Sequence, residues 1–92
     1  MGKAYFRVYE GLNDYLPRER RKRDFSFHLK ASTTVRDATS SLLIPPEKIE
    51  LVLINGESVS FESVIKNGDR VSFYPRFEFF DISSLTKCNG TN

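Results

Sequence analysis

Several chemically important residue types are scarce in this chain, and each shortage argues against a class of function. Its 92 residues include one cysteine, Cys88, and one histidine, His28. A single cysteine cannot form a disulfide within the chain. Neither residue has enough companions for a cysteine-rich or histidine-rich metal site. We therefore expect no bound metal and no disulfide framework.

Long apolar segments are also missing. No run approaches the roughly 20 apolar residues that a membrane-spanning helix requires. The opening residues, MGKAYFRVYEG, lack the apolar core and the small-residue cleavage site of a signal peptide. The sequence thus predicts no membrane partner, and together with the shortage of cysteine it favours the cytoplasm.

Neither sign of charge dominates. The chain carries 14 Lys and Arg against 12 Asp and Glu, a net charge of +2, so overall charge does not indicate a nucleic acid or a membrane as partner. Catalytic patterns are absent too: we find no glycine-rich phosphate loop, no convergent acid pair and no nucleophile beside a base. We therefore expect a protein that is not an enzyme and that binds no cofactor.

The clearest structural signal is the pair Asn55-Gly56 between two apolar segments. Both residues tolerate the positive φ that a type I′ turn demands, so residues 49–59 predict a strand, a tight turn and a returning strand. A second turn, Asn67-Gly68-Asp69, precedes a strand over residues 70–74 that Pro75 ends. We therefore expect a domain over residues 1–76 and a C-terminal extension over residues 77–92.

The earlier part of the chain contains two further strands and one helix. Residues 4–9 and 24–30 alternate between apolar and polar side chains, which predicts an antiparallel pair of strands joined by a polar loop. Thr34 and Asp37 then form a capping-box pattern at the start of a helix, and Pro45 and Pro46 follow its end. The order predicts an α+β fold with a mixed sheet of about five strands and one helix packed on one face. The expected core comprises Phe6, Val8, Phe25, Phe27, Leu29, Val35, Leu42, Ile54, Val71 and Phe73.

Four phrases carry a resemblance to a known family: YFRVYEGLNDYLP, LVLINGESVSF, NGDRVSFYP and FEFFDISSL. They resemble the ubiquitin-like domain associated with PIN-like ribonuclease domains of the Mut-seven C-terminal (Mut7-C) kind. The pattern also resembles the sulfur carriers, namely the molybdopterin-synthase small subunit and the thiamine sulfur carrier. The resemblance extends to about Leu85. It implies a ubiquitin-like β-grasp fold, a protein partner such as a PIN-like ribonuclease, and a link to RNA processing.

In the β-grasp order that this resemblance implies, the first and last strands are central neighbours. Polar and aromatic residues of both strands would then share the sheet face away from the helix. Ile49, Leu51 and Leu53 alternate onto one face of the central strand, and alignment to the Asn55-Gly56 turn favours that face outward. The phenylalanines after Pro75 either pack on the domain or dock onto a partner. The favoured function is protein–protein recognition by Tyr5, Arg7, Tyr9, Leu51, Leu53, Arg70, Tyr74, Phe77, Phe79 and Phe80.

Two alternative functions remain open. A loop rich in cations could contact the phosphates of RNA while the sheet tyrosines stack on bases, although a merely solvated loop would have the same composition. Its cations are Arg18, Arg20, Arg21, Lys22 and Arg23. The other alternative is a degenerate sulfur-carrier or conjugation-type protein. Such carriers end in Gly-Gly, whereas this sequence ends Lys87-Cys88-Asn89-Gly90-Thr91-Asn92.

Overall fold

The structure, a computed structural model, describes residues 2–76 and contains one sheet of five strands. The strands are β1 (Gly2–Val8), β2 (Phe25–Leu29), β3 (Ile49–Ile54), β4 (Glu57–Ser58) and β5 (Arg70–Pro75). The described part also contains one α-helix, α1 (Val35–Leu42), and the 3-10 helices η1 (Glu10–Tyr15), η2 (Arg18–Arg20) and η3 (Pro46–Lys48). The predicted α+β architecture is confirmed. The predicted extension, residues 77–92, lies outside the described residues.

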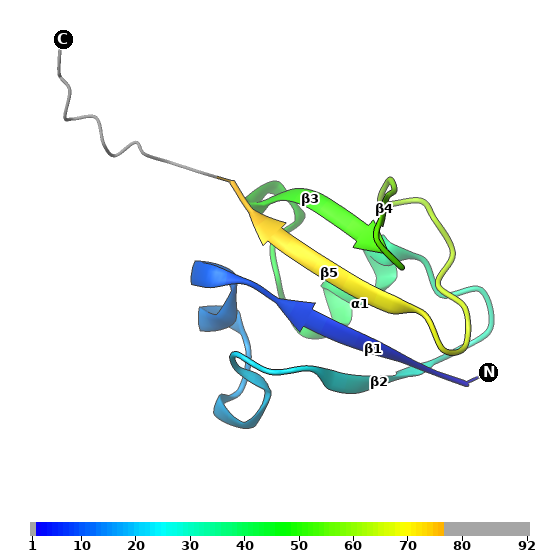
Figure 1. The fold of residues 1–92 in the computed structure, drawn as a ribbon, viewed down its shortest axis with the longest axis horizontal. Coiled ribbons are helices and arrows are strands. Elements are labelled where there is room, and N and C mark those ends of the chain that lie inside the picture. The colour runs from blue at the N-terminus through cyan, green and yellow to red at the C-terminus, as the bar shows by residue number, and fades with distance from the viewer. Residues whose placement is uncertain (1, 77–92) are drawn as a thin grey trace, which may run out of the picture.

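The strands are arranged in the order β2-β1-β5-β3-β4. The pairs β1–β2, β3–β5 and β3–β4 are antiparallel, whereas β1 and β5 run parallel to each other. Figure 1 shows α1 crossing behind the sheet, so one face is covered by the helix. In the described part of the chain the other face carries no helix.

The two predicted turns are bonded to each other. Asn55 and Gly56 have φ angles of 53° and 86°, the positive values that the Asn-Gly pair predicted. The Asn55 side chain donates to Asp69 Oδ1 (2.9 Å) and accepts from the Arg70 N–H (3.0 Å). The end of β3 is thereby fastened to the start of β5.

The same region also fixes β1. The Tyr5 N–H donates to the Asp69 carbonyl oxygen (2.9 Å), and the Gly68 N–H donates to the Lys3 carbonyl oxygen (2.8 Å). The Asn67 side chain accepts from the Lys3 N–H (3.0 Å). The second turn therefore sets the register in which the first strand pairs with the last.

The core lies between the sheet and α1. Phe6 and Phe73 are fully buried, with their rings edge to face and their centroids 5.6 Å apart. The expected core residues Val8, Phe25, Leu29, Val35, Leu42 and Val71 are buried as well. Phe27 and Ile54 are only partly buried and pack at the margin of the core.

One expectation about the central strand is wrong. Ile49 was expected on the same face as Leu51, but it is buried in the core. The pairing of β3 with β5 shifts between Ile49 and Leu51, which opposes Ile49 to Pro75 and Leu51 to Tyr74. Such an irregularity interrupts the two-residue alternation, so residues on either side of it no longer follow one pattern.

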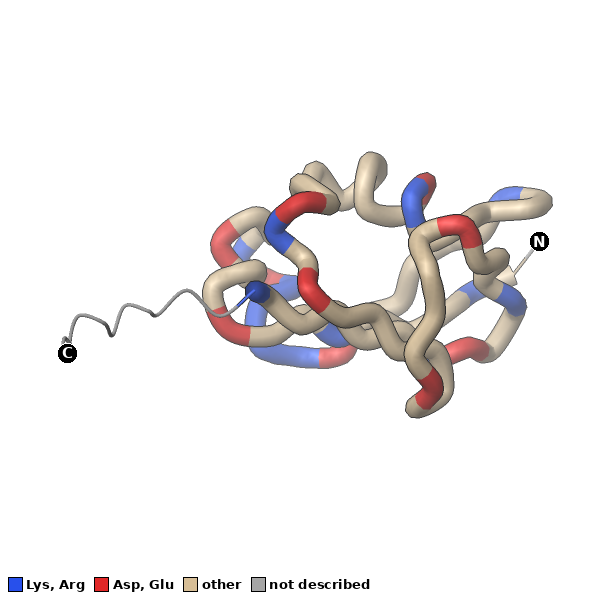
Figure 2. Tube along the Cα trace, turned by 90° about the horizontal axis from the view of Figure 1, so that it is seen from above, with Lys and Arg blue, Asp and Glu red and all other residues tan. Residues whose placement is uncertain are grey.

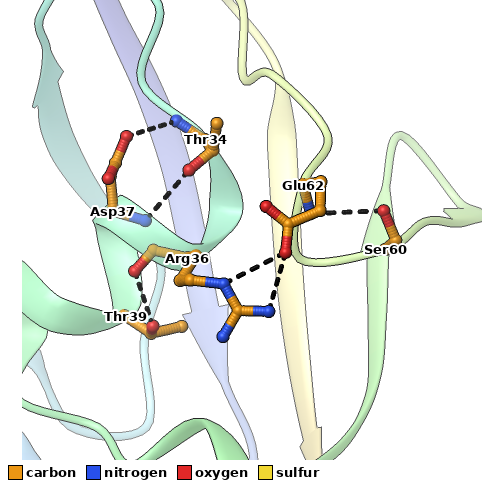
Figure 3. A network of polar contacts seen from close by, with 6 residues as sticks. All are labelled: Thr34, Arg36, Asp37, Thr39, Ser60 and Glu62. Atoms are coloured by element: carbon orange, nitrogen blue, oxygen red, sulfur yellow. Dashed lines mark hydrogen bonds and ion pairs between the residues drawn. The ribbon is translucent and has the colours of Figure 1, made fainter.

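The N-terminus of α1 is held by a capping box. The Thr34 side chain accepts from the Asp37 N–H (3.1 Å), and Asp37 Oδ2 accepts from the Thr34 N–H (3.0 Å). Beside it, Arg36 donates to Glu62 Oε2 through Nη2 (2.7 Å), as Figure 3 shows. The Arg36–Glu62 ion pair attaches the start of the helix to the segment that follows β4.

Replacing Phe73 tests the packing at the centre of the core. Because this ring is fully buried against Phe6, Phe73→Ala should lower the free energy of unfolding by about 3–5 kcal/mol. Ser72→Ala, on the opposite face of the same strand, should change it by less than about 0.5 kcal/mol. Urea unfolding followed by circular dichroism measures both. Equal stability of Phe73→Ala and the parent would contradict the register of β5.

The capping box should make stability depend on acid pH. Hydrogen bonds from the main chain and then the side chain of Thr34 lower the pKa of Asp37 below its ordinary value. The stabilisation is therefore complete above the unfolded-state pKa and is lost as pH falls through the folded-state pKa, below about pH 4. Melting curves from pH 7 to pH 2 should show a smaller acid-induced decrease for Asp37→Asn than for the parent. Asp14→Asn, an exposed control, should retain the parent's decrease.

Candidate functional site

The sheet face opposite α1, hereafter the open face, brings together most of the predicted site residues. The β1–β5 register sets Tyr5 beside Arg70 and Arg7 beside Ser72, and the β3–β5 register sets Leu51 beside Tyr74 and Leu53 beside Ser72. With the β1–β2 register and the contacts of Asp24, the open face comprises Lys3, Tyr5, Arg7, Tyr9, Asp24, Ser26, His28, Leu51, Leu53, Arg70, Ser72 and Tyr74. It spans β2, β1, β5 and β3. The prediction that the first and last strands are adjacent in the sheet is confirmed.

Two stacked tyrosines form the aromatic end of the open face. The rings of Tyr9 and Tyr74 are nearly parallel, at 3°, with centroids 4.5 Å apart. Desolvation raises the pKa of Tyr74, and the neighbouring Tyr9 hydroxyl acts in the same direction. Tyr74 is therefore uncharged at neutral pH, and the charge of this face comes from its other side chains.

Two arginines on the open face share one carboxylate. Arg7 Nη1 lies 3.6 Å from Asp24 Oδ1, and Arg70 Nη1 lies 3.8 Å from Asp24 Oδ2. The Arg7 guanidinium also lies over the Tyr9 ring, 5.4 Å from its centroid. Its Nε is buried and has no hydrogen-bond partner within residues 2–76. Two cations for one acid leave the middle of the face positively charged.

Asp24 is the functional residue that sequence reasoning missed. It precedes β2, and strand alternation from Ser26 and His28 would have placed it on the open face. The sequence does not predict that Arg70, on β5, reaches diagonally across β1 to the same carboxylate. That contact depends on the strand order and on the register of three strands.

Apolar side chains complete the open face. Tyr5 is 42% exposed and Leu51 is 38% exposed, while Leu53 is half-buried. The expectation that Leu51 and Leu53 lie outward and Val52 inward is consistent with these exposures. The remaining predicted site residues, Phe77, Phe79 and Phe80, lie outside the described residues.

The basic loop is partly engaged within the domain itself. Arg21 Nε donates to the Leu16 carbonyl oxygen (2.8 Å), and the Arg20 guanidinium lies 4.9 Å from the centroid of the Phe25 ring. Arg18, Lys22 and Arg23 are exposed. Figure 2 shows Lys and Arg interspersed with Asp and Glu along the described trace rather than gathered on one side.

The described residues offer little for other kinds of site. Within residues 2–76 no three His, Cys, Asp or Glu side chains gather as metal ligands. The helices in this part of the chain are too short or too polar to cross a membrane.

The fold and the sequence both have known relatives. Small archaeal modifier protein 1 of Haloferax volcanii superposes with a TM-score of 0.65 at 17% identity, over 84% of this chain and 100% of that one. A Pyrococcus furiosus protein assigned as molybdopterin converting factor subunit 1 superposes with a TM-score of 0.64 at 16% identity, with coverage of 84% and 100%. No curated protein matches the sequence.

These superpositions confirm the predicted ubiquitin-like β-grasp fold. The family model described as Mut7-C ubiquitin matches residues 1–81. This match extends over most of the sequence and confirms the family that the four sequence phrases resemble. The chain therefore belongs to the Mut7-C ubiquitin family of ubiquitin-like domains.

Proposed function

We propose that this domain is a non-enzymatic protein-recognition module that docks through its open face onto a PIN-like ribonuclease domain of the Mut7-C kind. The observation that supports this most is the composition of the open face. Tyrosines, arginines and leucines lie together on a sheet surface that no helix covers in the described part of the chain. The family to which the chain belongs supports the choice of partner.

The aromatic end is suited to act as an anchor. Tyrosine and arginine are enriched among the residues that dominate binding energy at protein interfaces. Tyr9 and Tyr74 already stack in the free domain. A partner would therefore meet a surface whose side chains lose little rotamer entropy on binding.

The cationic middle indicates the chemistry of the partner surface. Asp24 lies within 4 Å of both Arg7 and Arg70, and the side chains of Asp24 and Arg70 are more than half exposed. An acidic group on the partner could pair with the arginines that Asp24 only partly neutralises. Such complementarity mainly sets orientation and association rate, while the apolar side chains Tyr5 and Leu51 contribute desolvation.

The proposed docking surface also includes the phenylalanines of the C-terminal extension. Phe77 follows Arg76, whose N–H donates to the Lys48 carbonyl oxygen (3.2 Å) at the end of the sheet where Tyr74 lies. We include Phe77, Phe79 and Phe80 because their side chains are apolar and they come soon after Tyr74 in the sequence.

Matched substitutions test whether the open face is the docking surface. Tyr5 and Tyr15 are exposed to similar extents, 42% and 39%, but only Tyr5 lies on the open face. Leu51 and Val64, 38% and 48% exposed, form a second pair of this kind. Tyr5→Ala and Leu51→Ala should each weaken binding to a purified Mut7-C ribonuclease domain by about tenfold. Tyr15→Ala and Val64→Ala should change it less than about twofold.

Isothermal titration calorimetry gives these affinities, and circular dichroism verifies that each variant is folded. On addition of the ribonuclease domain, the parent protein should also show amide shift changes confined to the strands of the open face, β1, β2, β3 and β5, and to the C-terminal extension. If the parent shows neither heat nor shifts at millimolar concentration, this choice of partner is wrong. If all four variants lose affinity equally, the open face is not the docking surface.

The RNA-binding alternative makes a different prediction. If the basic loop binds phosphates, replacing Arg20, Arg21, Lys22 and Arg23 by Ser should flatten the dependence of log affinity on log salt. The slope would change by up to about 3, at roughly 0.7 for each phosphate that the variant no longer neutralises. Titrating single-stranded RNA at several salt concentrations measures this slope. Under the proposed function the same variant keeps its affinity for the ribonuclease domain.

A further inference from the structure

Strand β2 forms one edge of the sheet, and no described strand lies beyond it. Figure 1 shows it along the border of the sheet, next to β1. Its pairing with β1 runs without interruption from Gly2↔Leu29 to Phe6↔Phe25. Proline, bulges and very short length commonly protect such edges from further pairing, and β2 contains no proline and pairs with β1 without a bulge.

The hydrogen bonds of β1 reveal which main-chain groups of β2 face outward. The N–H groups of Tyr5 and Tyr9 donate toward β5, to Asp69 and Phe73. Main-chain direction alternates along a strand, so Ala4 and Phe6 turn their groups toward β2. Their partners Phe27 and Phe25 are therefore bonded to β1. The N–H and carbonyl groups of the intervening residues, Ser26 and His28, face away from the sheet.

Outward groups at Ser26 and His28 permit a symmetric pairing of β2 with itself. A second copy running antiparallel, with the two-fold axis at Phe27, places Ser26 opposite His28 of that copy and His28 opposite Ser26. These are the positions at which an antiparallel pair exchanges hydrogen bonds. Phe27 meets Phe27 at the intervening position, where side chains approach most closely. Lys30 stays outside the ladder because its N–H and carbonyl group already bond to the Thr33 hydroxyl.

The side chains are complementary in this register. Asp24 of each copy lies opposite Lys30 of the other, so charges of opposite sign meet at both ends. Both side chains are on exposed residues. Phe27 is only half-buried in the single domain. Beside it, a cavity of about 410 Å³ between β2 and α1, lined in part by Lys30, Ser40 and Ser41, leaves room for an incoming side chain.

We propose that the edge of β2 is an interface between two copies of this chain, joined antiparallel about Phe27 into one continuous sheet. The contact is limited to a five-residue strand and its flanks. It is therefore smaller than the roughly 1,600 Å² of a standard stable interface, and the association is weak and depends on concentration.

Sedimentation equilibrium of the full chain tests the proposal. The weight-average mass should rise from 10.6 kDa toward twice that value as the concentration approaches millimolar. Amide resonances of Ser26 and His28 should shift on the same concentration scale. A mass that stays at 10.6 kDa throughout would overturn the proposal.

Variants locate the interface. Ser26→Pro removes an outward N–H without removing a bond to β1, and proline is tolerated at such edge positions. It should weaken association by about tenfold or more while circular dichroism shows an unchanged fold. Leu43→Asn, a change at an exposed residue that directly follows α1, should leave association unchanged. Association that survives Ser26→Pro would contradict the β2 edge.

A charge exchange keeps the test decisive if Ser26→Pro fails to fold. Lys30→Glu and Asp24→Lys should each associate about tenfold more weakly than the parent, because like charges then face each other at both ends. An equimolar mixture of the two should regain association. In the mixed pair the introduced lysine faces the introduced glutamate at one end, and Asp24 faces Lys30 at the other. If the mixture associates no better than either variant alone, the antiparallel register is wrong.

Discussion

The parallel pairing of β1 with β5 is the constraint on which the rest of the molecule depends. It joins the start of the chain to the last described strand, so no short connection enforces it. The register is set instead by the second turn, where Asp69 and Gly68 bond to β1 and Asp69 also bonds to Asn55. A slip of one residue would turn the core side chains of these strands outward. These polar contacts therefore determine which residues are buried and which are presented.

The open face follows directly from that register. Tyr9 and Tyr74 can stack, and Arg7 and Arg70 can share Asp24, only while β1, β2 and β5 keep their alignment. Many exposed ion pairs contribute little to stability. The arrangement around Asp24 is better understood as positioning two guanidinium groups beside an aromatic pair. The site is thus assembled by the core, because burial of Phe6 and Phe73 on one face fixes their neighbours on the other.

Local signals in the sequence predicted much of this fold. Asn55-Gly56, the Thr34–Asp37 capping box and the alternation in β1, β2 and β5 all act within a few residues, and the structure confirms them. The burial of Ile49 was not predictable, because it depends on how β3 pairs with β5. The role of Asp24 likewise depends on strands that are distant in sequence. Most of the open face was predictable only because family resemblance supplied the strand order.

The two edge strands of the sheet, β4 and β2, differ in their capacity to pair with a further strand. At one end β4 is two residues long and pairs only with Leu53 and Ile54, too short to template another strand. At the other end β2 presents a regular five-residue edge. The open face is perpendicular to that edge, so a docked partner and a second copy would occupy different surfaces. They would nevertheless share Asp24. In the paired form, Lys30 of the second copy would compete with Arg7 and Arg70 for the Asp24 carboxylate. The two arginines would then be less neutralised, so the open face would bind an acidic group of a partner more tightly.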